Sequence, residues 1–95
     1  MALRYLHLRR SKVLANGKVR IENFGGATLA FEVTEAGVFV AVARCNDKDN
    51  FNKRLGRLIS SNRFNKGLIN KVDECHQVVK VEECIINWYR RTYGN

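Results

Sequence analysis

Three cations lie close together in the stretch FNKRLGRLIS, at Lys53, Arg54 and Arg57. At about 100° per helical residue, their side chains fall within an arc of about 100° on one side of a helix. A solvated helix face usually mixes such cations with glutamates as i,i+4 partners, but this stretch contains no acid. The spacing therefore indicates either a phosphate-binding stripe or the exposed side of a packed helix.

The charge distribution extends this pattern to two basic segments. Residues 1–21 and 50–71 contain no Asp or Glu, and the net charge of the chain is +8. Such segments predict a polyanionic partner, with solubility as the alternative explanation. The candidate residues for binding nucleic acid or a partner are Lys53, Arg54, Arg57, Arg63, Arg9, Arg10, Lys12, Arg90 and Arg91.

Aromatic rings and glycines could complete such a site. Bases stack on aromatic side chains, and we expect Phe24 and Tyr5 to be exposed, although packing is the alternative role for both. Gly56 lies inside the basic helix and either packs against the sheet or lets a ligand approach. The same two roles are open for Gly25 and Gly26.

No motif predicts a metal, a cofactor or catalysis. Cys75, His76 and Cys84 form no C-x-x-C pair, and an adjacent Cys and His on a strand point to opposite faces. There is no nucleophile elbow and no carboxylate pair suited to acid–base work. Asp47 and Asp49 are explained as caps of the basic helix. We therefore predict a protein that is not an enzyme and needs no cofactor.

The elements that position these residues can be predicted from periodicity. Asn16-Gly17 is typical of a hairpin turn, and a second strand pair surrounds the turn at residues 35–37. The alternating residues 3–10 predict a further strand. We expect a short strand at 76–81.

Two helices follow from a change of period. Phe51, Leu55, Leu58 and Ile59 are spaced as a buried stripe, which leaves the cations outside. The second helix covers residues 81–94, with one face formed by Val81, Ile85, Trp88 and Tyr89. We predict a single α+β domain over residues 1–95: an antiparallel β-meander of four to five strands with two α-helices packed on one face.

The chain has no apolar run near the roughly 18 residues that span a bilayer, and its N-terminus does not resemble an export signal. We therefore predict no membrane association, and free thiols for the three cysteines in a reducing cytoplasm.

One segment resembles a known pattern. The stretch VFVAVARCNDKDNFNKRLGRLISSNRF is similar to a motif of small, mostly uncharacterised phage and prophage proteins. In that motif an apolar strand ends in Cys, and Asp, Phe, Lys and Gly-Arg follow. The matching positions are Cys45, Asp49, Phe51, Lys53, Gly56, Arg57, Ile59 and Arg63. The resemblance implies a mobile element, the cytoplasm of a host bacterial cell, and a role in host takeover or counter-defence.

Three functions remain open. The first is binding of nucleic acid or a host nucleoprotein complex. The second is inhibition of a host defence or transcription protein through the same basic face. The third is capture of a small phosphate-bearing ligand between Gly25-Gly26, Lys53 and Arg57. A homodimer is compatible with each of them.

Overall fold

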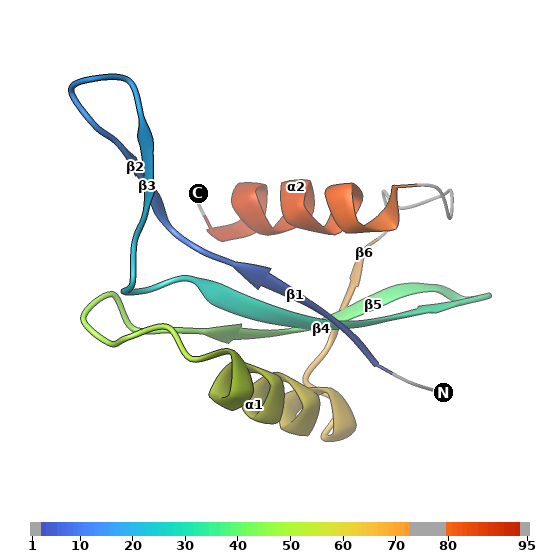
Figure 1. Cartoon of the computed structure of the whole chain (residues 1–95). Helices are drawn as coiled ribbons and strands as arrows, with labels where there is room; N and C mark the ends of the chain where they lie inside the picture. Colours follow the sequence, from blue (N-terminus) through green and yellow to red (C-terminus); the bar gives the residue numbers. More distant parts are fainter. Residues whose placement is uncertain (1–2, 73–79, 94–95) are drawn as a thin grey trace.

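The structure is a computed structural model that describes residues 3–72 and 80–93. It has the predicted α+β composition (Figure 1). The strands are β1 (Arg4–Leu8), β2 (Ser11–Val13), β3 (Val19–Ile21), β4 (Ala27–Thr34), β5 (Gly37–Arg44) and β6 (Asn70–Val72), and the helices are α1 (Lys53–Asn65) and α2 (Val81–Tyr93). The strand predicted at 76–81 falls mostly on residues outside the described ranges.

The main sheet is antiparallel, with strand order β1-β4-β5-β6. Its centre is the β4–β5 hairpin, whose register runs from Ala27 opposite Arg44 to Thr34 opposite Gly37. β1 pairs with β4 and not with its neighbour in sequence, because β2 and β3 form a separate two-stranded sheet between them. The antiparallel sheet is confirmed, but the strands are not a simple meander.

The two helices lie on opposite faces of the sheet, so the prediction that both cover one face was wrong (Figure 1). The reason is the alternation of side chains in β4, which is buried on both sides. Leu29 and Phe31 point into the core that α2 covers. Thr28 points the other way, toward Gly56 of α1.

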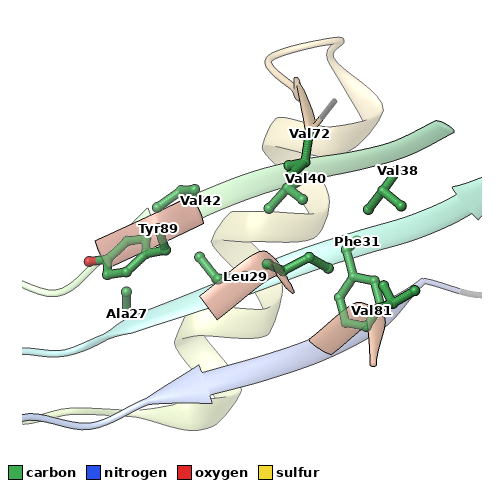
Figure 2. Close-up of a cluster of buried hydrophobic side chains, with 10 residues drawn as sticks. Ala27, Leu29, Phe31, Val38, Val40, Val42, Val72, Val81 and Tyr89 are labelled. Atoms are coloured by element: carbon green, nitrogen blue, oxygen red, sulfur yellow. The ribbon is translucent and has the colours of Figure 1, made fainter. Parts of the chain in front are cut away.

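The face under α2 holds the hydrophobic core. Val81, Ile85 and Tyr89 are the buried residues of this helix, at the predicted i, i+4 and i+8 spacing. They pack against Leu29 and Phe31, and Trp88 covers the edge of the cluster. Figure 2 shows Leu29 and Phe31 projecting from β4, on the side away from α1, toward Val81 and Tyr89 of α2.

The face under α1 is built from small residues. Ser60 is fully buried, whereas Leu55 and Leu58 are 50% and 57% exposed, so these two members of the predicted stripe do not pack on the sheet. Phe51 and Ile59, its other two members, are partly buried. A Cβ at Gly56 would lie 2.8 Å from the Cβ of Thr28, which means that the helix backbone itself approaches the sheet. The helix cap is Asn52, whose side chain accepts a hydrogen bond from the Leu55 amide at 3.0 Å, and not Asp47 or Asp49.

Candidate functional site

An open cleft of about 710 Å³ lies at one end of the main sheet. Four arginines line it, and they come from three separate parts of the chain. Arg9 and Arg10 connect β1 to β2, Arg44 is the last residue of β5, and Arg90 lies in the last turn of α2. We call this site the arginine cleft. The fold therefore brings Arg9 and Arg10 of the N-terminal basic segment together with Arg44 and Arg90, which lie outside both basic segments.

Aromatic rings hold two of these guanidinium groups. Arg9 lies 4.8 Å from the ring centroid of Phe51, and Arg44 lies 5.0 Å from that of Tyr93. Arg9 also donates a hydrogen bond to the Glu22 carbonyl at 2.9 Å. Neither contact neutralises the cation, because a ring and a carbonyl carry no net charge. The side chains are thus oriented without losing their charge.

The charge of the cleft is only partly balanced. Arg10 pairs with Asp47 at 3.1 Å, and Asp47 is the one acid among the described residues that line the cleft. Arg9, Arg44 and Arg90 make no ion pair with a carboxylate in residues 3–72 or 80–93. An anion entering the cleft would meet three uncompensated guanidinium groups, the groups best suited to bind phosphate in a bidentate manner.

Lys53, Arg54 and Arg57 form a second cationic group, the α1 cations. All three are exposed, as the spacing predicted, and no carboxylate of the described part of the chain lies within 4.0 Å of them. Their field reaches into the protein. Burial lowers the pKa of His7 below its ordinary value of 6.5, and the charges of Arg57 and Lys53 lower it further.

Phe51 connects the cleft with the α1 cations. Its ring meets the His7 ring edge-on at a centroid distance of 6.0 Å, and it also contacts the guanidinium group of Arg9. Phe51 directly precedes the cap residue Asn52, so the cleft and the first turn of α1 are neighbours. We call the arginine cleft and the α1 cations together the basic surface.

The glycines near this surface serve packing. Gly25 and Gly26 have φ angles of +72° and +90°, which few other residues adopt. A Cβ at Gly26 would lie 2.5 Å from the Leu8 carbonyl, and one at Gly25 would lie 2.6 Å from Cδ of Arg10. Because neighbouring atoms fill this space, the glycines do not form an open phosphate cradle. The cleft includes Gly26, but its lining contains neither Lys53 nor Arg57.

The remaining predicted residues are dispersed. Arg63 donates a hydrogen bond to the Val42 carbonyl at 2.6 Å, which ties α1 to β5. Lys12 lies on β2, outside the cleft lining. Arg91 follows Arg90 and donates to the Asn87 carbonyl at 3.4 Å.

Arg44 is the cleft residue that the sequence analysis missed. It is the last residue of a mostly buried strand, and it lies outside both acid-free segments. The sequence signal for Arg44 is its position at the end of a central strand, where the chain leaves the sheet. Of the aromatic candidates, Phe24 is 48% exposed and lines a smaller hollow with Arg10 and Lys12, whereas Tyr5 is half-buried.

The cysteines agree with the prediction only in part. Cys45 is a free thiol that lies 3.5 Å from the Asp49 carbonyl oxygen, but Cys84 is disulfide-bonded. Within residues 3–72 and 80–93, no three His, Cys, Asp or Glu side chains are grouped closely enough to hold a metal ion. Neither helix that the structure describes has the length and apolar character needed to span a membrane.

Comparison of the chain with protein-family models, with curated proteins and with solved structures found no match. The fold and the site define a small α+β domain with a cationic surface at one end.

Proposed function

We propose that this protein is a small, non-enzymatic accessory protein of a phage or prophage that binds nucleic acid, alone or in a nucleoprotein complex, through its basic surface. The observation that supports this most is the arginine cleft, where Arg9, Arg44 and Arg90 converge without a neutralising carboxylate among the described residues. Like charges that are gathered and left unpaired repel one another, and a polyanion removes that cost.

The arrangement favours a phosphate backbone over a single small anion. The cleft is open, and the α1 cations continue the positive charge beyond it. A small ligand site is usually a concave and mostly apolar pocket, whereas this one is lined by guanidinium groups. Several phosphates along a strand could be bound in sequence by the cleft and by the first turn of α1.

We assign no catalytic role to His7 and Thr28, because a substrate cannot reach the Thr28 hydroxyl. His7 Nδ1 lies 2.9 Å from Thr28 Oγ1, the type of pair from which a nucleophile and base could be made. However, Thr28 is fully buried beneath α1, so no substrate reaches its hydroxyl. A role in host takeover or counter-defence is proposed from the resemblance of residues 38–64 to phage proteins.

The test is the salt dependence of binding. We expect wild-type affinity for a fluorescently labelled duplex to fall between about 50 and about 200 mM salt, by roughly 40-fold if three phosphates are neutralised. The variant Arg44→Ala/Arg90→Ala should make the log–log salt slope shallower by about two. Fluorescence anisotropy measures both quantities.

The matched control is Lys66→Ala/Lys80→Ala, which removes the same charge from exposed positions outside the cleft. It should leave the slope close to that of the wild type. Equal slopes for the two double variants would show that only net charge matters, and the absence of binding at low salt would remove the proposal.

A second candidate function is inhibition of a host protein. It is favoured by the outer side of α1, where Leu55 and Leu58 are half-exposed beside Arg54 and Arg57. Arginines mixed with apolar side chains are typical of protein interfaces, whereas leucine side chains make no favourable contact with phosphates. The acidic surface of a nucleic-acid-binding host protein would suit this face.

Purification of the tagged protein from infected cells, with and without nuclease, separates the two functions. One stoichiometric host protein that persists after nuclease and is lost in Leu55→Ser/Leu58→Ser would support inhibition. Loss of all partners after nuclease would support nucleic-acid binding.

A further inference from the structure

The β2–β3 hairpin, which we call the ribbon, stands away from the rest of the protein (Figure 1). Its two strands pair only with each other, with Ser11 opposite Ile21 and Val13 opposite Val19. Every residue of both strands is exposed, and Val13 and Val19 are 69% and 63% exposed. The ribbon therefore contributes nothing to the hydrophobic core.

The ribbon has two chemically different faces, because side chains alternate along each strand. Lys12 and Arg20 are cross-strand partners and share one face. The opposite face carries Val13, Val19 and Ile21, the last 55% exposed. The two strands contain no acid, although Glu22 and Asp47 line the hollow beside Lys12 at the base of the ribbon. Neither Lys12 nor Arg20 makes an ion pair with the described carboxylates.

Such an element is difficult to explain without a partner. An isolated two-stranded hairpin is marginally stable in water, and exposed β-branched side chains add no packing energy. A dimer formed through the ribbon alone is not favoured, since three apolar side chains offer far less than the roughly 800 Å² per partner that a stable interface buries. The cationic face instead matches an anionic groove.

The position of the ribbon supports the same partner. Arg9 and Arg10 lie at its base, where Arg9 binds the Glu22 carbonyl and the Glu22 amide donates to the Arg10 carbonyl at 2.8 Å. The ribbon thus begins at the arginine cleft, and both strands leave from it. A duplex whose backbone lies in the cleft would place its adjoining groove beside the ribbon.

We propose that the ribbon enters the major groove of B-form duplex DNA, with Lys12 and Arg20 toward the base edges and phosphates and the cleft arginines on the flanking backbone. The major groove of B-DNA, about 12 Å wide, accommodates a two-stranded β-ribbon. The major groove of A-form RNA is too narrow and deep for side chains to read. This inference rests on the proposed function and specifies its ligand as duplex DNA.

The first experiment compares one sequence as duplex DNA, duplex RNA and single-stranded DNA by fluorescence anisotropy. We expect the wild type to prefer duplex DNA, and Lys12→Ala/Arg20→Ala to weaken duplex DNA binding about ten-fold or more. Single-strand binding should change much less, because the cleft remains intact. Since both side chains are exposed, the variant should fold, and its thermal unfolding is compared with that of the wild type.

The second experiment tests directly whether the protein occupies the major groove. Bound wild type should protect guanine N7, a major-groove atom, from methylation, and Lys12→Ala/Arg20→Ala should lose that protection. Lys66→Ala/Lys80→Ala, with the same loss of charge, should keep it.

Three results would overturn the inference: equal affinity for DNA and RNA duplexes, unprotected guanine N7, or a mass that shows dimers broken by Val13→Lys/Val19→Lys. If Arg44→Ala/Arg90→Ala lost binding but the ribbon variant did not, the proposed role of the ribbon would be rejected and the proposed function would be kept. If the wild type bound no nucleic acid, both would fail.

Discussion

The two faces of the main sheet are packed in opposite ways. Under α2, large apolar side chains such as Phe31, Leu29 and Ile85 fill the space between helix and sheet. Under α1, the contact is made by Gly56 and the fully buried Ser60, and a helix backbone lies almost on the sheet. Large side chains fill the space under α2, whereas small residues let α1 approach the sheet closely.

The difference explains which helix exposes apolar side chains to the solvent. α2 uses its apolar stripe to close the core, so its buried residues are the predicted ones. α1 uses a strip of small residues, which turns Leu55 and Leu58 to the solvent together with the cations. The close approach of α1 therefore exposes a mixed apolar and basic surface that a stripe-packed helix would have buried.

The largest expected effect is on the α2 face. Ile85→Ala should lower the free energy of unfolding by about 3 kcal/mol, because it removes a fully buried side chain and leaves a cavity. Leu58→Ala, the matched aliphatic change on α1, should cost less than about 0.5 kcal/mol, since Leu58 is exposed. Urea unfolding of both variants measures the contrast, and equal losses would contradict the assignment of the packed faces.

The next effect tests the close approach of α1. Alanine in place of an exposed helical glycine gains about 1 kcal/mol, but Gly56→Ala should destabilise by about 2 kcal/mol because its Cβ would overlap Thr28. Asn62→Ala, on the exposed side of the same helix, is the control and should not destabilise. Urea midpoints report both.

A double-mutant cycle sharpens this result. Gly56→Ala should cost less in the background of Thr28→Ala, which removes the hydroxyl and methyl groups nearest to the new Cβ. If Gly56→Ala stabilised the protein, or if the two substitutions were additive, α1 would not contact the sheet as described.

The smallest effect is a pH dependence that arises from His7 on the α1 face. The pKa of His7 is below 6.5 in the folded protein, because of burial and then of Arg57 and Lys53. The unfolded state therefore binds the proton first, and stability is complete above the unfolded pKa and falls as the pH decreases from about 6.5 toward the folded pKa.

The measurement is urea unfolding at about pH 7.5 and about pH 5.5, in wild type and His7→Gln. The wild type should lose more stability on acidification than the variant does. Charge removal by Arg57→Ala should reduce the difference without abolishing it, because burial remains the larger cause. A wild type that is more stable at the lower pH would contradict the direction of the shift.

Local patterns determined much of this protein. The hairpin turn at Asn16-Gly17 forms, with Gly17 at a φ of +83°. The β4–β5 pair forms as the alternation predicted. Residues 38–64 build a strand, turn and helix, in which the Cys45 thiol lies against carbonyls of the turn and Gly56 against Thr28.

Other features depended on contacts between distant residues. The periodicity of α1 favours Leu55 and Leu58 as its packed face, yet the small side chains opposite it select Gly56 and Ser60. A hydrophobic pattern states which face is apolar, and not whether the facing surface is shaped to receive it. The same limit applies to the placement of the helices. A strand that is buried on both faces does not reveal which helix covers which face of the sheet.

From the sequence alone came both helices and all strands except β6, which was not predicted. The exposed cations at Lys53, Arg54 and Arg57 and the two acid-free segments also came from the sequence, because charge and periodicity are local properties. Tertiary structure alone decided that Arg9, Arg10, Arg44 and Arg90 would share one cleft. Their positions are set by where β5 and α2 end in space, and these ends meet only after the strands have paired and the core under α2 has closed.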